Sequence, residues 1–282
     1  DSGLYCASNG TLDSITPAAG NSETYHYTVH YPMATYLFSL AISSYVVWEQ
    51  DYVYNSGLDT MPIIHHVYPY WDAYSRDTWG KTPEIMTKLA ATFGEYPFTD
   101  EKYGHANFNW GGGMEHQTVT SMYGGSTWAF GTSIVAHEMG HQWWGDMITC
   151  ASWHDIWLNE GWASYAEAVY YLAGSGWNTY HSYMRGMAYY GGGTVWCDDT
   201  TDIWRIFSGN LSYDKGAWVV HMLRGGLGEV DFATAVDAYY NSEFKFGAAT
   251  TADFREVVET ATGRELDWFF SEGVKYQING TD

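Results

Sequence analysis

The segment His137-Glu138-Met139-Gly140-His141 constrains this chain more than any other, because it has the form H-E-x-x-H. Residues four apart share one face of an α-helix, so a helix over 132–145 directs both imidazoles to one point. Trp143 and Trp144 continue the segment with large apolar side chains, which predicts that it is buried. Two histidines and a glutamate on a buried helix need polar partners, and a metal ion supplies them.

A third ligand is expected from the segment 157–163, which places Glu160 in a second apolar helix. An unpaired carboxylate would be costly there. Glu160 lies nineteen residues after His141, which leaves room for one helix to end and another to begin. Zinc suits His137, His141 and Glu160, because catalytic zinc commonly takes three protein ligands and leaves one position for water. We therefore expect one zinc per chain, with Glu138 as the general base; the alternative is two surface histidines on an ordinary helix.

Along the chain, predicted strands come first and predicted helices follow. Aromatic and β-branched runs predict strands at 25–31, 41–54, 63–68 and 103–110. A helix is predicted to start near Pro83, and later helices near 132–145, 157–173, 213–227, 231–242 and 251–262. This order indicates an α+β catalytic domain rather than alternating βαβ units.

The glycine run 111–113 follows the predicted strand 103–110 directly. Glycines let the edge of a strand approach a ligand backbone closely, so a peptide could add there as an extra strand. The alternative is a glycine-rich turn with no role.

The charge of the chain limits the kinds of molecule that it is expected to bind. The 33 acidic and 12 basic residues give a formal charge of −21, which argues against nucleic acid and against an anionic membrane surface. No uninterrupted apolar stretch reaches the roughly 18 residues that a membrane span needs. Three cysteines (Cys6, Cys150 and Cys197) leave one over if a disulfide forms, and the sequence does not pair them.

Four separated segments resemble the aminopeptidase N-like zinc metallopeptidases, which are gluzincins. The likeness covers most of residues 25–275, and the segments are Gly112-Gly113-Met114-Glu115-His116, residues 137–146, Trp157-Leu158-Asn159-Glu160-Gly161 and Tyr213-Asp214-Lys215-Gly216. The resemblance implies a thermolysin-like zinc peptidase domain, a mixed sheet followed by a helical lobe, with the zinc ligands already named.

The resemblance also implies roles for further residues. Tyr213 would donate a hydrogen bond to the oxyanion of the tetrahedral intermediate. Glu115 would bind the free α-amine of the substrate, within a substrate-binding set of Gly112, Gly113, Met114 and Glu115. The family motif usually ends in Asn, where this sequence has His116.

Residues 1–58 resemble the end of the β-rich domain that precedes the catalytic domain in this family. We therefore expect the remnant of that domain at 1–58, the catalytic domain at 59–282, and further domains of the same polypeptide outside this chain. The expected activity is zinc-dependent removal of N-terminal residues from peptide substrates. One alternative is a zinc endopeptidase on the same site, which would also cut N-blocked peptides. Another is a non-catalytic binding module of a larger surface protein, against which the intact Glu138 argues.

Overall fold

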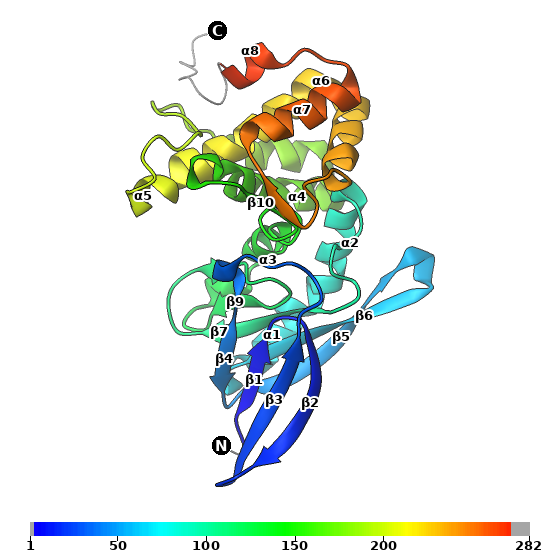
Figure 1. Cartoon of the computed structure of the whole chain (residues 1–282), viewed down its shortest axis with the longest axis vertical. Helices are drawn as coiled ribbons and strands as arrows, with labels where there is room; N and C mark the ends of the chain where they lie inside the picture. The colour runs from blue at the N-terminus through cyan, green and yellow to red at the C-terminus, as the bar shows by residue number, and fades with distance from the viewer. Residues whose placement is uncertain (1–2, 272–282) are drawn as a thin grey trace. The chain divides into compact units, whose positions relative to one another are not determined.

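The computed structural model describes residues 3–271. The chain divides into two compact units, the first made of residues up to 87 and 95–142, the second of residues 88–94 and those from 143 onward. Most strands lie in the first unit and most α-helices in the second (Figure 1). The predicted α+β class, with strands first and helices afterwards, is confirmed.

Two short antiparallel pairs open the first unit. Strand β1 (Tyr5–Ser8) pairs with β4 (Leu40–Ser43), and β2 (Thr11–Ala18) pairs with β3 (Ser22–Thr28), which overlaps the predicted strand 25–31. A hydrogen bond of 2.6 Å from the Tyr27 hydroxyl to the Cys6 carbonyl ties one pair to the other.

A mixed sheet forms the rest of the strand-rich part of this unit, in the order β5-β6-β7-β9-β8. Its strands are β5 (Val46–Tyr54), β6 (Asp59–Val67), β7 (Tyr103–Phe108), β8 (Gly113–Met114) and β9 (Thr120–Tyr123). The pairs β5–β6 and β8–β9 are antiparallel, and β6–β7 and β7–β9 are parallel. The predicted strands at 63–68 and 103–110 correspond to β6 and β7, while 41–54 divides into β4 and β5. Strand β8 lies at one edge of this sheet and β5 at the other, so β8 presents a backbone edge with which a peptide could pair.

Three α-helices belong wholly or partly to the first unit. They are α1 (Asp72–Thr78), α2 (Thr82–Phe93) and α3 (Thr132–Gly140). The predicted helix near Pro83 is α2, whose apolar positions Ile85, Met86, Leu89 and Phe93 are fully buried. Short 3-10 helices lie at Thr35–Leu37, Asn55–Gly57, Pro69–Trp71, Trp79–Lys81, Thr127–Phe130 and Trp153–Asp155.

The second unit is helical and has a core rich in tryptophan. Its elements are β10 (Ile148–Cys150), α4 (Trp157–Gly186), α5 (Ile203–Ile206), a π-helix (Gly209–Lys215), α6 (Gly216–Tyr240), β11 (Gly247–Ala249), α7 (Thr251–Thr262) and α8 (Asp267–Phe269). Strands β10 and β11 pair in parallel. Trp143, Trp144, Trp157 and Trp162 are each at most 1% exposed, so the many tryptophans fill a core.

Several predicted helices of this unit are confirmed, and two are corrected. Helix α7 spans 251–262 as predicted, and 157–173 lies within α4. The predicted helices 213–227 and 231–242 fall in one element, α6, which is interrupted at Gly228 (φ 78°). Helix α6 begins only at Gly216, because the preceding turn is a π-helix.

The predicted helix 132–145 also ends early, at Gly140. The Gln142 amide bonds the Met139 carbonyl at 3.0 Å, a tighter turn than an α-helix makes. Gly145 has a φ of 144°, which does not continue a helix. The chain thereby turns toward β10.

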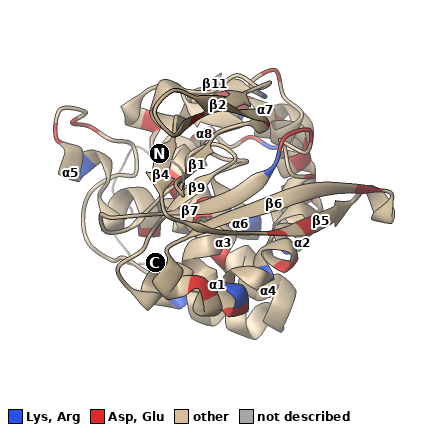
Figure 2. Cartoon of the chain, turned by 90° about the horizontal axis from the view of Figure 1, so that it is seen from below, with Lys and Arg blue, Asp and Glu red and all other residues tan. Residues whose placement is uncertain are grey.

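Other features of the sequence are located as follows. Among the described residues, no helix is long and apolar enough to cross a membrane. Acidic side chains occur on many elements, among them α1, α2 and α7 (Figure 2).

The thiols of Cys6 and Cys197 are buried and free, and burial raises the pKa of each. The predicted domain boundary at 58/59 falls at the turn of the β5–β6 hairpin and stays a prediction.

Candidate active site and metal centre

Helix α3 carries the predicted ligand His137 and the predicted base Glu138, and the predicted ligand His141 directly follows it. Val135, Ala136 and Met139 are fully or almost fully buried and anchor the helix in the first unit. His141 lies just past the last helical residue but keeps helical φ and ψ of −60° and −27°, and its amide bonds the His137 carbonyl at 3.2 Å. The i, i+4 geometry is therefore preserved although the helix is shorter than predicted.

Glu160 lies in the first turn of α4 and is 3% exposed. Its neighbour Asn159 accepts a 2.9 Å hydrogen bond at Oδ1 from the Cys150 amide. The Glu160 amide donates to the Ile156 carbonyl at 3.0 Å. The start of α4 is thus fixed at Asn159 and at the backbone of Glu160, as suits a side chain that would hold a metal ion in one position.

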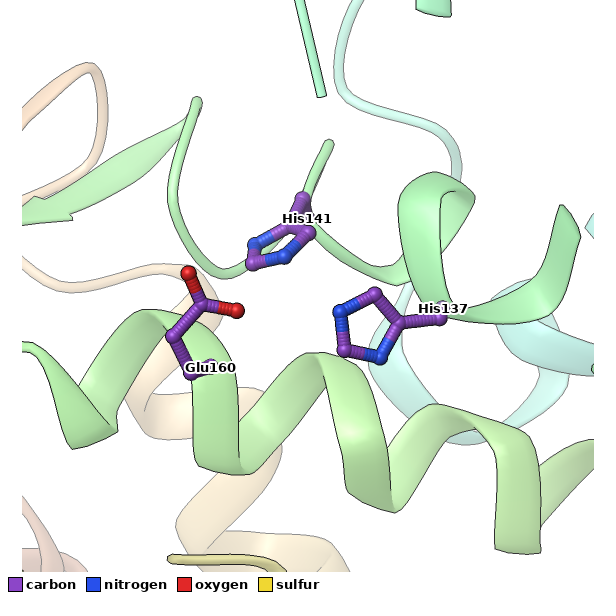
Figure 3. A group of neighbouring side chains, drawn as sticks. All are labelled: His137, His141 and Glu160. Atoms are coloured by element: carbon purple, nitrogen blue, oxygen red, sulfur yellow. The ribbon is translucent and has the colours of Figure 1, made fainter. Parts of the chain in front are cut away.

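The structure brings the three predicted ligands together. One nitrogen of each of His137 and His141 and one carboxylate oxygen of Glu160 all lie within 4.8 Å of one another, and all three residues are buried. Figure 3 shows their side chains directed toward a common point. Two imidazoles and one carboxylate are a donor set of catalytic zinc sites, so the residues present fit a zinc ion.

The glycine-rich edge of the sheet lies against the predicted base. A Cβ at Gly113 would stand 2.1 Å from Oε1 of Glu138, so the backbone of β8 lies directly beside this carboxylate and a larger residue would displace it. Gly112 has a φ of 109°, a conformation that favours glycine. Gly113 and Met114 pair with Met122 and Ser121 of β9. The other edge of β8 is the one that a substrate backbone would approach.

Glu115 and His116 directly follow β8. Glu115 is 8% exposed, and its carbonyl accepts a 3.2 Å hydrogen bond from Nε2 of Gln142. Nδ1 of His116 lies in a 2.9 Å hydrogen bond with Oγ of Ser121. Burial lowers the pKa of His116 to about 4, so this imidazole is neutral near pH 7.

Tyr213 lies in the π-helix Gly209–Lys215 and is half-buried. Single π-helical turns occur frequently at functional sites. Two bonds hold this turn: the Ser212 hydroxyl donates to the Ile206 carbonyl at 2.6 Å, and the Lys215 ammonium donates to the Gly193 carbonyl at 2.7 Å. These bonds fix the backbone on either side of Tyr213.

Two glycines join the segment of Tyr213 to that of Glu160. A Cβ at Gly161 would stand 2.7 Å from the Gly216 carbonyl carbon, and one at Gly216 would stand 2.8 Å from the Gly161 Cα. The two backbones therefore touch where α4 and α6 begin. Sequence analysis assigned no role to this pair or to Gln142, although all three lie inside the motifs it singled out. The sequence signal that could have found them is their position: each comes at most three residues after a predicted ligand or catalytic residue.

Comparisons with known proteins agree with this geometry. The sequence model described as "Peptidase family M1 domain" matches residues 127–272. The chain is 32% identical over 174 residues to probable aminopeptidase 2 of Sulfurisphaera tokodaii, covering 53% of this chain and 21% of that protein. It is 34% identical over 147 residues to aminopeptidase N of Streptomyces lividans, covering 48% and 17%.

Solved structures share the fold. An M1 zinc metallopeptidase variant of Deinococcus radiodurans, bound to a Tyr-Ser-Ala substrate, aligns with a TM-score of 0.82 at 24% identity over 96% of this chain and 61% of that one. Legionella pneumophila aminopeptidase A, in complex with aspartic acid, aligns with a TM-score of 0.86 at 20% identity over 97% and 33%.

The chain spans about a fifth of the length of the curated relatives above. The family match nevertheless covers more than half of the chain and runs through α3, α4 and the segment of Tyr213. On this match the chain belongs to peptidase family M1.

Proposed function

We propose that this chain is the catalytic part of a zinc-dependent aminopeptidase, which removes N-terminal residues from peptides. The observation that carries the proposal is the convergence of His137, His141 and Glu160, with Glu138 lying against the glycine-rich edge of β8. The relatives that the chain matches are named aminopeptidases, and the proposal extends that activity to this protein.

The metal and the base have separate tasks. His137, His141 and Glu160 would hold the zinc ion, which would supply the charge that acidifies a water molecule and polarises the scissile carbonyl. Glu138 accepts the proton that the water loses as its oxygen attacks the carbonyl carbon. It then delivers this proton to the leaving amine as the C–N bond breaks. The closeness of Glu138 to Gly113 supports this role, because a substrate on β8 would present its peptide bond there.

Tyr213 is proposed as a hydrogen-bond donor to the oxyanion that forms on the carbonyl oxygen. A donor fixed in place before the reaction stabilises that charge with no cost of reorganisation. The bonds that hold the π-helical turn support a fixed position for the backbone that carries this side chain.

Glu115 is proposed to hold the substrate's α-ammonium. A buried carboxylate can form a charge-assisted hydrogen bond to an ammonium, and the strand edge that precedes it, Gly112 to Met114, would bind the adjoining backbone. A substrate anchored by its amine would be cut after its first residue. The participation of further domains in the full activity stays a prediction.

The test compares an aminoacyl coumarin amide with its N-acetylated twin in the zinc-loaded wild type. We expect kcat/KM to be higher by at least roughly 100-fold for the free amine, because a site that bonds a polar group rejects analogues lacking it. In Glu115→Gln, which keeps the size of the side chain but loses its charge, this ratio should collapse toward one. Equal rates on both substrates in the wild type would instead support an endopeptidase, and no hydrolysis of any peptide would support a binding module.

A further inference from the structure

The loop 115–119 directly follows β8 and begins with Glu115. It is held by hydrogen bonds from Gln142 and from the N-terminal part of the chain. It is short and wholly or largely buried, and Thr118 within it has a φ of 63°, a conformation uncommon for threonine. Such a conformation persists only where the surroundings fix it. The contacts that fix this loop therefore also fix the start of the segment, Glu115.

The side chain of Gln142 forms hydrogen bonds to the backbone of this loop at two residues. Its Oε1 accepts a 2.9 Å hydrogen bond from the Thr118 amide and a 3.3 Å bond from the Tyr96 hydroxyl. Its Nε2 donates a 3.2 Å bond to the Glu115 carbonyl. One fully buried amide thus holds the backbone of the loop at both Glu115 and Thr118.

Gln142 is also fixed at its own backbone, directly after the metal-binding helix. It follows His141 in sequence, and its amide donates to the Met139 carbonyl at 3.0 Å. A single residue therefore connects the end of the H-E-x-x-H segment to the segment that bears Glu115.

The N-terminal part of the chain supports the loop from another direction. The Thr118 hydroxyl accepts hydrogen bonds from the Gly10 amide at 2.9 Å and from the Lys102 ammonium at 3.3 Å. Asn9 donates from Nδ2 to the Gln117 carbonyl at 2.6 Å. These contacts hold the far end of the loop, whereas the bond to the Glu115 carbonyl comes from Gln142.

We infer that Gln142 is a positioning residue for amine recognition: it sets where Glu115 lies relative to the metal-binding end of α3. The inference rests on the proposed function, in which Glu115 selects substrates with a free N-terminus. Gln142 touches neither metal nor substrate in this role. It sets the distance between Glu115, which binds the substrate amine, and the metal-binding end of α3. That distance decides whether the amine and the scissile bond can be bound at the same time.

The variant is Gln142→Met, which keeps the length of the side chain and loses its amide. The Thr118 amide and Glu115 carbonyl lose this partner, so the loop can shift. The ratio of kcat/KM for an aminoacyl coumarin amide to that for its N-acetylated twin should fall by roughly 10-fold or more, because small displacements weaken a contact that depends on position. The fall should come mainly from KM for the free amine, while zinc content by elemental analysis stays at the wild-type level.

The chain offers a matched control in Gln117. It lies in the same loop, is also fully buried, and its side-chain amide has no hydrogen-bond partner among the described residues. Gln117→Met should therefore leave the substrate ratio unchanged. A second test variant, Gln142→Leu, also removes both the acceptor oxygen and the amide donor, with an apolar side chain of another shape; its ratio should also fall, which covers the case in which Gln142→Met does not fold.

The outcomes separate the two proposals. A high ratio in wild type and Gln117→Met, with a low ratio in a folded, zinc-loaded Gln142 variant, supports the positioning role. A high ratio that persists in folded Gln142 variants, even with a lower melting temperature, overturns it and leaves the aminopeptidase proposal standing. A wild-type ratio near one overturns the aminopeptidase proposal, and the positioning role with it.

Discussion

Replacing Gly161 by alanine tests whether backbone contact between α4 and α6 sets the geometry of catalysis. Gly161 follows the ligand Glu160, and its partner Gly216 comes three residues after Tyr213. An added Cβ would meet backbone atoms of Gly216 at 2.7 Å and 2.8 Å. Backbone cannot rotate away as the end of a flexible side chain can, so the two helices must separate.

The structure gives the size of the effect. To reach ordinary contact the shortest distance must rise from 2.7 Å to at least 3.4 Å, a shift of about 0.7 Å. Misplacement of a catalytic group by about 1 Å can cost roughly 100-fold in rate. We therefore expect kcat to fall by roughly 10- to 100-fold. Overpacking should also cost about 1–3 kcal/mol of stability, partly offset by the about 1 kcal/mol that alanine gains over glycine in a helix.

The assay compares kcat, zinc content and melting temperature in Gly161→Ala and wild type. The matched control is Gly225→Ala in α6, where an added Cβ meets nothing within 4 Å. That variant should keep its kcat and melt at an equal or higher temperature. Wild-type kcat and stability in Gly161→Ala would refute the reasoning, because they would show that the crossing has room for a methyl group.

The remaining predictions concern the metal, the base, the oxyanion donor and acid stability. His141→Ala should lose zinc by elemental analysis, whereas Glu138→Gln should keep it and lose at least roughly 100-fold in kcat; an active Glu138→Gln would show that another group takes the proton. Tyr213→Phe should lower kcat by roughly 100-fold with little change in KM, and an unchanged kcat would remove its assigned role. Burial lowers the pKa of His105 to about 3 and of His66 to about 4, so both are neutral in the folded protein. In the unfolded chain each histidine has a pKa of about 6.5, so below that pH the unfolded state binds protons that the folded state does not. Each histidine should therefore lower the free energy of unfolding by about 1.4 kcal/mol per pH unit below about 6.5. The urea midpoint should be lower at about pH 5.5 than at about pH 7.5, and equal midpoints would contradict this.

The convergence of the three proposed metal ligands was predictable because its geometry is mostly local. His137 and His141 share a helical face by their spacing alone, and the apolar residues around them indicated burial, which the structure confirms. Glu160 was predictable for a related reason, since a carboxylate within an apolar helix requires a partner. Neither inference needs knowledge of how the chain folds over longer distances.

The environment of Tyr213 was not predictable in the same way. Apolar periodicity indicated an α-helix from 213, but the structure has a π-helix at Gly209–Lys215 and α6 only from Gly216. Periodicity does not reveal a π-helical turn, because its i→i+5 bonds depend on the packing around it. Gln142 shows a similar limit. It and Gln117 are equally buried, yet the partners of Gln142 lie 24, 27 and 46 residues away in sequence.

Three motifs of this site thus place, beside a proposed functional residue, a neighbour that contacts another motif: Gly161 and Gly216 contact each other, and Gln142 bonds the Glu115 carbonyl. Gly161 follows Glu160, Gly216 comes shortly after Tyr213, and Gln142 follows His141. The contact of the two glycines lies in the second unit, and the hydrogen bonds described for Gln142 join residues of the first unit. Their effects should therefore differ in kind, with Gly161→Ala lowering kcat on every substrate and Gln142→Met lowering selectivity for the free amine. In the double variant the two losses should multiply, because independent contacts contribute additively to the free energy of the transition state.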